Sequence, residues 1–570
     1  MVPIPTTGFL RSNPMNVLPC RSMTPLHIRA VTLGLLLVMI AGLGGCGSSS
    51  KPSKPPKGKG ATPPRTEDRF LGTIIDMCQP DRLGLDSSAD QVASLLNRWW
   101  IRSGEAIDPA NVFDEHATTL LEQNLPEQTL ERAVDTRFDE RDVEFIRDAQ
   151  LLREIVDRAL MQEDNPQVAL FDWVVRNVEL ESATDAIPKT PYEILMFGRG
   201  TAEDRAWVFA ELMRQMRLDT YIIKPADAGE SGRWLIAVED QNQLSQLFDP
   251  VIGVPVPSSP DASSLGDNDI ASLKQIQQNE NLWKSLYPAG SEGFDGKNFQ
   301  TWDAFAIGSS SLWSARMDLL QQSVGGDTLS AVISQSIPEA DRKLPSVKSI
   351  QLWAYPEQQL IGRYNTDKPL QYTELWLPFQ MPFSVELADG SIVPGRTPNE
   401  LQQNLILGRP LQLQLKARNT QLGGDLPNAI QQYINVRLQC TRMIGLPSVP
   451  TDVRRSHAEA FDDAYYWIGI CQFELDRPEQ AAQTFASYID QFGDRGGHLE
   501  QARLMLAECN LPPEDRRKHL DDVPVDSPAK LRAEYLSRTG ASDIPEKTPP
   551  ETPVEKEASQ AAGPAVAEKP

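Results

Sequence analysis

A helix followed by a series of short β-strands constrains the fold of this chain more than any other sequence feature. The helix is expected to begin at Thr201, because Asp204 lies three residues further on and completes a pattern typical of helix N-termini. Three β-rich runs follow, at Tyr221–Ile223, at Trp234–Val238 and up to Phe248-Asp249-Pro250. Within the helix, apolar residues recur at helical spacing and predict a buried face: Ala206, Phe209, Ala210 and Met213. This order predicts an α+β domain in which the helix leads into a small sheet.

The stretch from Thr190 to Val256 resembles the transglutaminase-like superfamily, whose core is papain-like. The resemblance rests on the order of a Gly-rich turn, a buried helix, two strands and an Asp-Pro pair. In that family a Cys stands at the N-terminus of the helix after a G-x-C turn, a His begins the next strand but one, and an Asp follows beside a Pro. The helix dipole and the imidazolium lower the pKa of such a thiol, and the Asp orients the imidazole.

Two of the three catalytic positions of that family lack the catalytic side chain in this sequence. Ala202 stands at the Cys position, Trp234 belongs to the segment at the His position, and Asp249 matches the third member. No Cys and no His occurs between residues 117 and 439, so a shifted alignment restores neither group. The resemblance therefore implies a transglutaminase-like domain that is a pseudoenzyme.

Two other interpretations of this stretch stay open. A different α/β domain can carry a Gly-Arg-Gly turn and an Asp-Pro pair by chance. Alternatively, Thr201 serves as a substitute nucleophile, although a threonine needs a neighbouring base and an N-cap role already explains the hydroxyl.

The N-terminal segment indicates the compartment. A positively charged region at His27–Arg29 precedes an apolar run over residues 30–42, which is too short to span a bilayer comfortably. The run ends in Leu43-Gly44-Gly45-Cys46, which resembles a bacterial lipobox. We therefore predict a lipoprotein signal peptide over residues 1–45 and lipid attachment at Cys46, which anchors the chain to a membrane.

An ordinary signal peptide or an uncleaved anchor explains the N-terminus less well, because a tether rich in Ser, Lys, Pro and Gly follows Cys46 as lipoproteins require. Its lysines either lie against anionic headgroups or belong to a solvated spacer. We expect a protein of the bacterial cell envelope that faces the periplasm or the exterior.

Charge and cysteine spacing exclude several classes of protein. The net charge of −23 repels phosphate backbones, so no nucleic-acid partner is expected. None of the six cysteines forms a C-x-x-C pair, and neither a metal site nor a cofactor is predicted. Cys471 and Cys509 fall in expected helices and are interpreted as small core residues.

The sequence is expected to divide into six consecutive parts. They are the signal peptide (1–45), a flexible tether (46–67), the transglutaminase-like domain with its N-terminal helices (68–258), a mixed region or insertion without a family (259–395), helical repeats (396–540) and a disordered tail (541–570).

Helices are expected before the central stretch. Ser87 and Asp90 indicate one helix start, residues 141–162 a second helix, and Asn165-Pro166 the start of a third. The pair Trp99-Trp100 and Trp173 are interpreted as core residues, and ligand stacking by the pair is the alternative.

The region after residue 258 is less regular. We expect one amphipathic helix at about Ile270–Leu286, helical structure over 301–336, and β-like runs at Ile350–Ala354 and Tyr372–Leu377. Whether this region completes the central domain or forms a separate module stays open.

The C-terminal third resembles tetratricopeptide repeats. Ala481 follows Gly469 by twelve residues and Phe485 lies four residues further, which are the small and aromatic positions of such a repeat. Ala429 with Tyr433 gives a second match, and Leu499–Cys509 is a further expected helix. Ala429 and Ala481 lie 52 residues apart instead of about 34, so an insertion is implied. A generic helical hairpin is the alternative.

Three functions are compatible with these patterns. The first is a non-catalytic binding or scaffolding lipoprotein with protein or peptide partners. The second is an envelope hydrolase or peptidase-like enzyme that uses a non-Cys site, for which Glu203, Asp204 and Asp249 supply carboxylates. The third is an assembly factor that works through its repeats alone.

Overall fold

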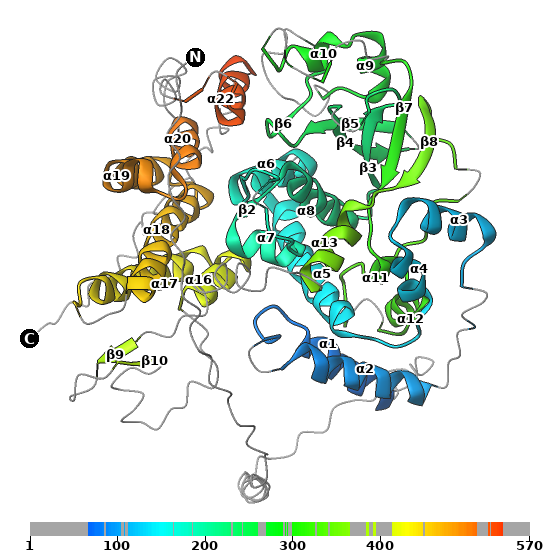
Figure 1. Cartoon of the computed structure of the whole chain (residues 1–570), viewed down its shortest axis with the longest axis horizontal. Coiled ribbons are helices and arrows are strands. Elements are labelled where there is room, and N and C mark those ends of the chain that lie inside the picture. Colours follow the sequence, from blue (N-terminus) through cyan, green and yellow to red (C-terminus); the bar gives the residue numbers. More distant parts are fainter. Residues whose placement is uncertain are drawn as a thin grey trace, which may run out of the picture. The chain divides into compact units, whose positions relative to one another are not determined.

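The structure of the protein is a computed structural model (Figure 1). It describes residues 66–84, 87–103, 108, 112–162, 165–184, 186–229, 232–241, 243–259, 270–288, 291, 293–294, 299–324, 328–339, 342–364, 384–386, 392–394, 413–447, 451–509, 523–524 and 526–539. The predicted signal peptide, Cys46, the run Tyr372–Leu377 and the tail 541–570 lie outside these residues. None of the helices in this part of the chain has the length and apolar character that a bilayer crossing requires.

The described chain opens with a run of helices. Asn165 caps the sixth of them, because its side chain accepts a hydrogen bond from the Val168 N–H, and this start is confirmed. The first helix begins at Thr66, so the last two residues of the predicted tether are helical. The helices are α1 (Thr66–Met77), α2 (Ala89–Ser103), α3 (Glu115–Asn124), α4 (Glu127–Val134), α5 (Glu140–Gln162), α6 (Pro166–Asn177) and α7 (Pro191–Phe197).

The tryptophans of these helices pack as core residues. Trp99 is buried among residues of α1, α2 and α5, and Trp100 packs edge-on against Phe138. Trp173 is half-buried against the cluster around α6 and α8 (Ala202–Gln215). These contacts agree with the predicted core role.

The centre of the fold is a six-stranded mixed sheet with the strand order β6-β5-β4-β3-β7-β8. All neighbouring strands are antiparallel except β7 and β8, which are parallel. With its surrounding helices this sheet makes the protein α+β. The strands are β3 (Thr220–Pro225), β4 (Leu235–Asp240), β5 (Gln243–Asp249), β6 (Val254–Pro255), β7 (Trp302–Ala306) and β8 (Val347–Leu352).

Helix α8 lies on one face of this sheet, as its apolar stripe predicts. Thr201 and Asp204 form a reciprocal capping box at its start, which confirms the predicted N-cap. Phe209 of α8, Phe171 of α6 and Phe248 of β5 meet with ring centroids about 5 Å apart. Aromatic pairs at this separation stabilise a core beyond the area that they bury. The three rings therefore join two helices to the sheet.

The opposite face of the sheet is covered by the segment that follows β6. Side chains alternate along the strands, so Ile222 packs towards α8 while Tyr221 and Ile223 pack on the other side. Two short helices, α9 (Leu273–Gln278) and α10 (Asn281–Lys284), cover that side, and Trp283 is buried there. The expected single helix over Ile270–Leu286 is therefore two helices, because the chain is extended at Asn279.

The middle region completes the sheet. The expectation of helical structure over 301–336 is wrong at its start, where Trp302–Ala306 forms strand β7 and pairs with β3. Alternating burial within this short run fits a strand, but its hydrogen bonds come from β3 and β8, which are both distant in the sequence. Helical structure does follow in α11 (Ser310–Trp313) and α12 (Ala315–Val324). The expected run Ile350–Ala354 overlaps β8, after which helix α13 (Tyr355–Tyr364) begins.

Successive helices of the C-terminal region pack side by side as an array. Gly469 of α18 lies against Phe485 of α19, and a Cβ at Gly469 would stand 2.6 Å from the phenyl ring. The predicted close approach at this pair is confirmed. The helices are α16 (Leu413–Leu422), α17 (Leu426–Ile444), α18 (Thr451–Glu474), α19 (Pro478–Phe492), α20 (Leu499–Glu508) and α22 (Pro528–Thr539).

The hairpins α16–α17 and α18–α19 repeat one another with the predicted offset of 52 residues. In the first, the Thr420 hydroxyl bonds to the side chain of Gln432 at 3.1 Å. In the second, the Thr484 hydroxyl bonds to the side chain of Gln472 at 2.6 Å, so the two residue types have exchanged helices. The two hydrogen bonds therefore join equivalent positions of the two hairpins.

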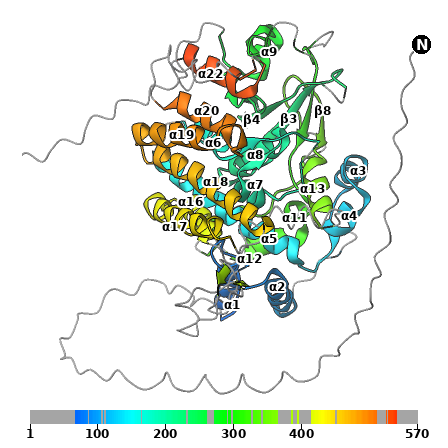
Figure 2. The same cartoon turned by 60° about the vertical axis from the view of Figure 1, so that its left-hand side comes forward.

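Helices α16, α18 and α20 of this array lie against α6 and α7 (Figure 2). The buried guanidinium of Arg418 donates to the carbonyl of Leu195 at 2.7 Å and 2.9 Å. Tyr466 donates to the carbonyl of Arg176 at 3.4 Å, and Gln501 donates to that of Val175 at 3.3 Å. Helices α6 and α7 therefore form the surface of the α+β core against which the array packs.

Candidate functional site

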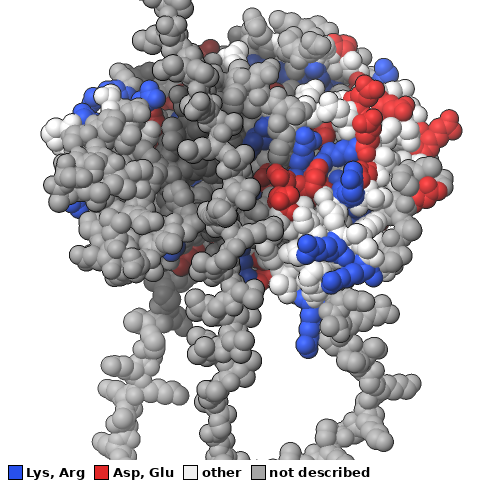
Figure 3. Space-filling view, turned by 60° about the horizontal axis from the view of Figure 1, so that its bottom comes forward, with Lys and Arg blue, Asp and Glu red and all other residues white. Residues whose placement is uncertain are grey.

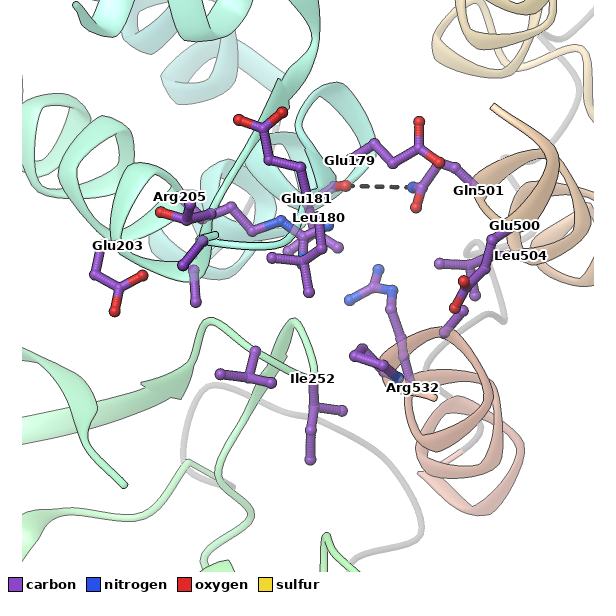
Figure 4. Close-up of a pocket in the computed structure, with 17 residues that line it drawn as sticks. Glu179, Leu180, Glu181, Glu203, Arg205, Ile252, Glu500, Gln501, Leu504 and Arg532 are labelled. Carbon is purple, nitrogen blue, oxygen red and sulfur yellow. Dashed lines mark hydrogen bonds between the residues drawn. The ribbon is translucent and has the colours of Figure 1, made fainter. Parts of the chain in front are cut away.

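A cavity of about 370 Å³ lies at the N-terminus of α8 (Figure 4). Its walls come from four places: the segment from the end of α6 through β1 (Glu179–Leu180), the start of α8, the turn between β5 and β6, and the helices α20 and α22. Ala202, Val251, Ile252, Leu504 and Ala529 supply apolar parts of the lining. The core and the helical array therefore form the cavity together.

Ala202 lines this cavity with a methyl group. It is the first residue of α8, which is the position that the family resemblance assigns to a nucleophile. Thr201 precedes it, and Glu203 follows it and lines the cavity as well. The start of α8 thus offers no thiol at the predicted position.

The hydroxyl of Thr201 is engaged on both sides. It accepts the N–H of Asp204 at 3.1 Å and lies 3.0 Å from the phenol oxygen of Tyr355. Tyr355 donates its own proton to the carboxylate of Asp204 at 2.9 Å, so the Thr201 hydroxyl is the donor to Tyr355. The hydroxyl therefore serves the helix cap and the contact with α13.

Burial raises the pKa of Asp204 to about 6, although Lys189 and the hydrogen bonds from Thr201 and Tyr355 oppose the shift. Burial likewise raises the pKa of Tyr355, and the nearby Asp204 charge adds to the rise. A phenol with a raised pKa stays protonated at neutral pH, so no phenolate is available to accept the proton of Thr201. The Thr201–Tyr355 pair is therefore ill suited to activate a nucleophile.

Asp249 is turned away from the cavity lining. Its carboxylate accepts hydrogen bonds from Trp283 at 2.8 Å and from Tyr287 at 2.6 Å. It also accepts the N–H groups of Val251 and Ile252 at 3.0 Å and 3.1 Å. Burial raises the pKa of Asp249, and the bonds from Tyr287 and Trp283 oppose that rise. Asp249 thus holds the turn after β5.

Trp234 also lies outside the cavity lining. It is half-buried, and its ring centroid lies 6.3 Å from that of Trp353, which in turn stacks on Tyr355 at 5.0 Å. Of the three predicted positions, the structure brings only Ala202 to the cavity. Trp234 and Asp249 pack in the neighbouring core instead.

Two arginines that line the cavity were not singled out from the sequence. Arg205 of α8 is 3 % exposed and donates to the carbonyls of Val178 at 2.8 Å and Pro250 at 3.3 Å. Among the described residues no carboxylate forms an ion pair with it. A charged residue on the same face of the helix as Ala202 and Phe209 was the signal available in the sequence.

Arg532 of α22 is also buried, but it has two carboxylate partners. It bonds to Glu508 at 2.8 Å, to Asp172 at 2.8 Å and to the carbonyl of Gly253. Asp172 in turn pairs with Arg176. Arg532 therefore has carboxylates in direct contact, whereas Arg205 has none among the described residues.

Several glutamates surround the cavity, and they differ in their partners. Glu181 pairs with Lys189, and Glu179 pairs with His498 at 2.8 Å. Glu500 accepts a hydrogen bond from the neutral hydroxyl of Ser527. Neither Glu203 nor Glu500 forms an ion pair among the described residues, although the charge of Glu500 acts on Arg205 from a distance.

The described residues contain no group of three or more His, Cys, Asp and Glu placed to hold a metal ion. Their four cysteines are free and buried, and burial raises the pKa of Cys78, Cys440 and Cys509 to about 12. Cys471 and Cys509 lie in or beside the cores of the array helices, as predicted.

A second hollow, of about 660 Å³, is lined by residues of α1, α5 and α16 and contains none of the predicted positions. On the face shown in Figure 3, basic and acidic side chains lie interspersed among the coloured residues. The cavity at α8 is therefore the better candidate site.

No protein-family model matches the chain, and comparisons with curated proteins and with solved structures find no match either.

Proposed function

We propose that the protein is a membrane-anchored lipoprotein of the bacterial envelope that binds a ligand without transforming it. In this proposal Cys46 carries the lipid, a transglutaminase-like core lacks its catalytic dyad, and tetratricopeptide-like helices supply the second wall of the binding site. The observation that carries the binding role is the cavity of about 370 Å³ at the start of α8. Ala202 lines this cavity at the position to which the proposed family resemblance assigns a nucleophile.

The hydrogen bonds around this cavity support binding over catalysis. The Thr201 hydroxyl is held by Asp204 and Tyr355, and the Asp249 carboxylate is held by Trp283 and Tyr287 outside the cavity lining. Thr201 therefore has no base beside it, and Asp249 does not reach a ligand in the cavity. What remains open to a ligand is a pocket with apolar walls and a few charged groups, which is the usual composition of a binding site.

The position of the helical array supports a small ligand. Helices α16, α18 and α20 contact the α+β core, so that face is not free to receive a large folded partner. The cavity volume lies near the lower end of the range for ligand pockets. A small molecule or a short peptide fits these dimensions. A protein partner would have to bind the outer helices α17 and α19.

Turnover assays on the purified full-length protein test the proposal. We expect no hydrolysis or transamidation of peptide, amide and ester substrates above the rate in buffer. Turnover that Thr201→Val abolishes would contradict the proposal. Lys274→Ala, in α9, is a matched surface control.

An envelope hydrolase is the second candidate function. It is favoured by one observation, the carboxylate of Glu203, which lines the cavity and has no ion-pair partner among the described residues. In such an enzyme Glu203 is the general base. Turnover by the wild type that is lost in Glu203→Gln would establish it, whereas equal rates in both proteins, at the level of buffer, exclude it.

The membrane anchor has a separate test. Cys46→Ser removes the atom that carries the lipid, so we expect the variant to leave the membrane fraction and to lose incorporation of a labelled fatty acid. A Cys46→Ser protein that still takes up the label would contradict lipidation at this residue.

A further inference from the structure

Arg205 is the most unusual charged group of the cavity. Its guanidinium is buried, and Nε and Nη1 donate to backbone carbonyls of Val178 and Pro250. No hydrogen bond among the described residues uses Nη2, and no carboxylate there forms an ion pair with the group. The charges of Glu179 and Glu500 favour its protonated form only from a greater distance. A buried charge without an opposite charge is costly, so such a group is expected to have a charged partner.

The positive charge of Arg532 increases the free-energy cost of burying Arg205 without an ion-pair partner. Figure 4 shows the side chains of Arg205 and Arg532 entering the cavity from α8 and α22. Burial, and after it the positive charge of Arg532, lower the pKa of Arg205 to about 9, although the charges of Glu179 and Glu500 oppose the shift. Arg205 stays protonated at neutral pH, and an anion beside it would relieve both effects.

The start of α8 adds hydrogen-bond donors at the same place. The capping box uses the N–H groups of Thr201 and Asp204, and no hydrogen bond among the described residues uses those of Ala202 and Glu203. Both residues line the cavity. Free N–H groups at the start of a helix of this length attract an anionic group.

Negative charges at the cavity restrict which anion fits. Glu203 and Glu500 line it without a cationic partner, and they repel a ligand that is purely anionic. A ligand with a carboxylate for Arg205 and an ammonium group for these glutamates satisfies both. Free amino acids and short peptides have this pattern of charges.

We propose that the cavity binds the carboxylate of a zwitterionic amino acid or short peptide through Arg205 and the first N–H groups of α8. The ammonium group of the ligand then lies towards Glu203 and Glu500. This inference rests on the proposed binding function and names the chemical class of its ligand.

A ligand series on the unmodified full-length protein tests the inference by isothermal titration calorimetry. The probe is the dipeptide alanyl-alanine, compared with its C-terminal amide and with its N-acetyl derivative. Loss of a charge-assisted hydrogen-bonded pair weakens binding by about 10- to 100-fold. We expect the amide to bind at least about tenfold more weakly than the dipeptide, and the acetylated form to be weakened as well.

Variants locate the carboxylate. Arg205→Met keeps the length of the side chain and removes its charge, so the preference for the free acid over the amide should disappear. Arg205→Lys keeps the charge, so this variant should retain part of the preference for the free acid. Arg153→Met is the matched control, because Arg153 also donates to a backbone carbonyl, that of Gln215 at 2.7 Å, but does not line the cavity.

Equal affinity for the dipeptide and its amide overturns the inference, and this result needs no variant. Binding of inorganic phosphate in place of the dipeptide overturns it too, because the site would then select a simple anion. If neither the dipeptide nor phosphate binds, this inference fails while the non-catalytic role stands. That role fails by a different result, namely turnover in the substrate assays.

Discussion

The indole ring of Trp467 in α18 lies directly on Gly198, the residue that ends α7. A methyl group placed on Gly198 would overlap Cζ2 and Cη2 of Trp467. The guanidinium carbon of Arg418 lies 3.6 Å from the centroid of the same ring. The array and the α+β core are thus joined by a tryptophan that contacts both a glycine and an arginine.

Gly198→Ala is expected to destabilise the protein by about 2–5 kcal/mol, because it combines a clash with Trp467 and a side chain at a positive φ of 66°. The free energy of unfolding in urea measures the effect. Gly229→Ala is the matched control, since Gly229 has a φ of 62° but nothing within 4 Å of the added methyl group. The control should lose only about 1–2 kcal/mol, and equal losses in both variants would show that the Trp467 contact contributes nothing.

The imidazole of His498 joins the same two parts of the protein and makes stability depend on pH. Burial and the charge of Arg199 lower its pKa, but the hydrogen bonds to Asp463 at 3.0 Å and Glu179 at 2.8 Å outweigh them and raise it. Because the pKa is raised on folding, the stabilisation is complete below the unfolded pKa of about 6.5 and is lost as pH rises through the folded pKa.

His498→Gln should therefore cost most at low pH, about 3–5 kcal/mol near pH 6, and less near pH 9. Urea unfolding of wild type and variant across this range gives the difference. His116→Gln in α3 is the matched control, whose difference from wild type should stay small. If the stability difference between the wild type and His498→Gln grew with pH, it would contradict the stabilising ion pairs of protonated His498.

Asp204 gives a second dependence on pH, at lower values. Because burial raises its pKa to about 6, the stability that Asp204 contributes below its unfolded pKa of about 3.9 is lost as pH rises through about 6. Asp204→Asn keeps an oxygen for the cap and does not ionise. As pH rises from about 4 to 7, the free energy of unfolding of the variant should increase relative to that of the wild type by roughly 1–3 kcal/mol. Urea unfolding measures this difference. Asp425→Asn, at the exposed cap of α17, is the matched control, and a flat difference for Asp204→Asn would refute the prediction.

The two hairpins of the array predict that a pair of residues can be exchanged. Thr420→Gln and Gln432→Thr each break the hydrogen bond of the first hairpin and should cost about 1 kcal/mol. The double variant recreates the pair Gln472–Thr484 of the second hairpin and should recover most of that loss. Thermal unfolding of all four proteins measures the coupling. Strictly additive losses would mean that the hairpins are not equivalent.

Local signals predicted the parts of the fold that local interactions decide. The cap at Thr201 and the stripe of α8 required only neighbouring residues, and so did the start of α6 at Asn165. The close approach of Gly469 and Phe485 followed from spacing within one hairpin. These features need no knowledge of distant parts of the chain.

Strand β7 shows where such reasoning fails. Its hydrogen bonds come from β3, about eighty residues earlier, and from β8, about forty-five residues later. Its five residues carry too little pattern to stand out from the helical surroundings. The contact of Trp467 with Gly198 cannot be predicted from the sequence either. A glycine at the end of a helix is already explained by its left-handed backbone conformation, so it gives no sign of a tertiary contact.

The candidate site was predicted only in part for a similar reason. Ala202 was found because a family pattern points to the start of α8, but Asp249 fits the same pattern while its carboxylate bonds to Trp283 and Tyr287. Arg205 and Arg532 lie 327 positions apart in the sequence and become neighbours only when α22 packs on the core. A family motif therefore locates the cavity at the start of α8, but it does not predict the arginines that line it.

Mass spectrometry of the full-length protein with alanyl-alanine and with its thioester, an activated acyl donor, tests binding without chemistry most directly. Under native conditions we expect a complex with the intact dipeptide. Under denaturing conditions we expect residues 190–256 to carry no added mass after incubation with the thioester. An acyl group that stays on Thr201 or elsewhere in this stretch after denaturation would contradict the account.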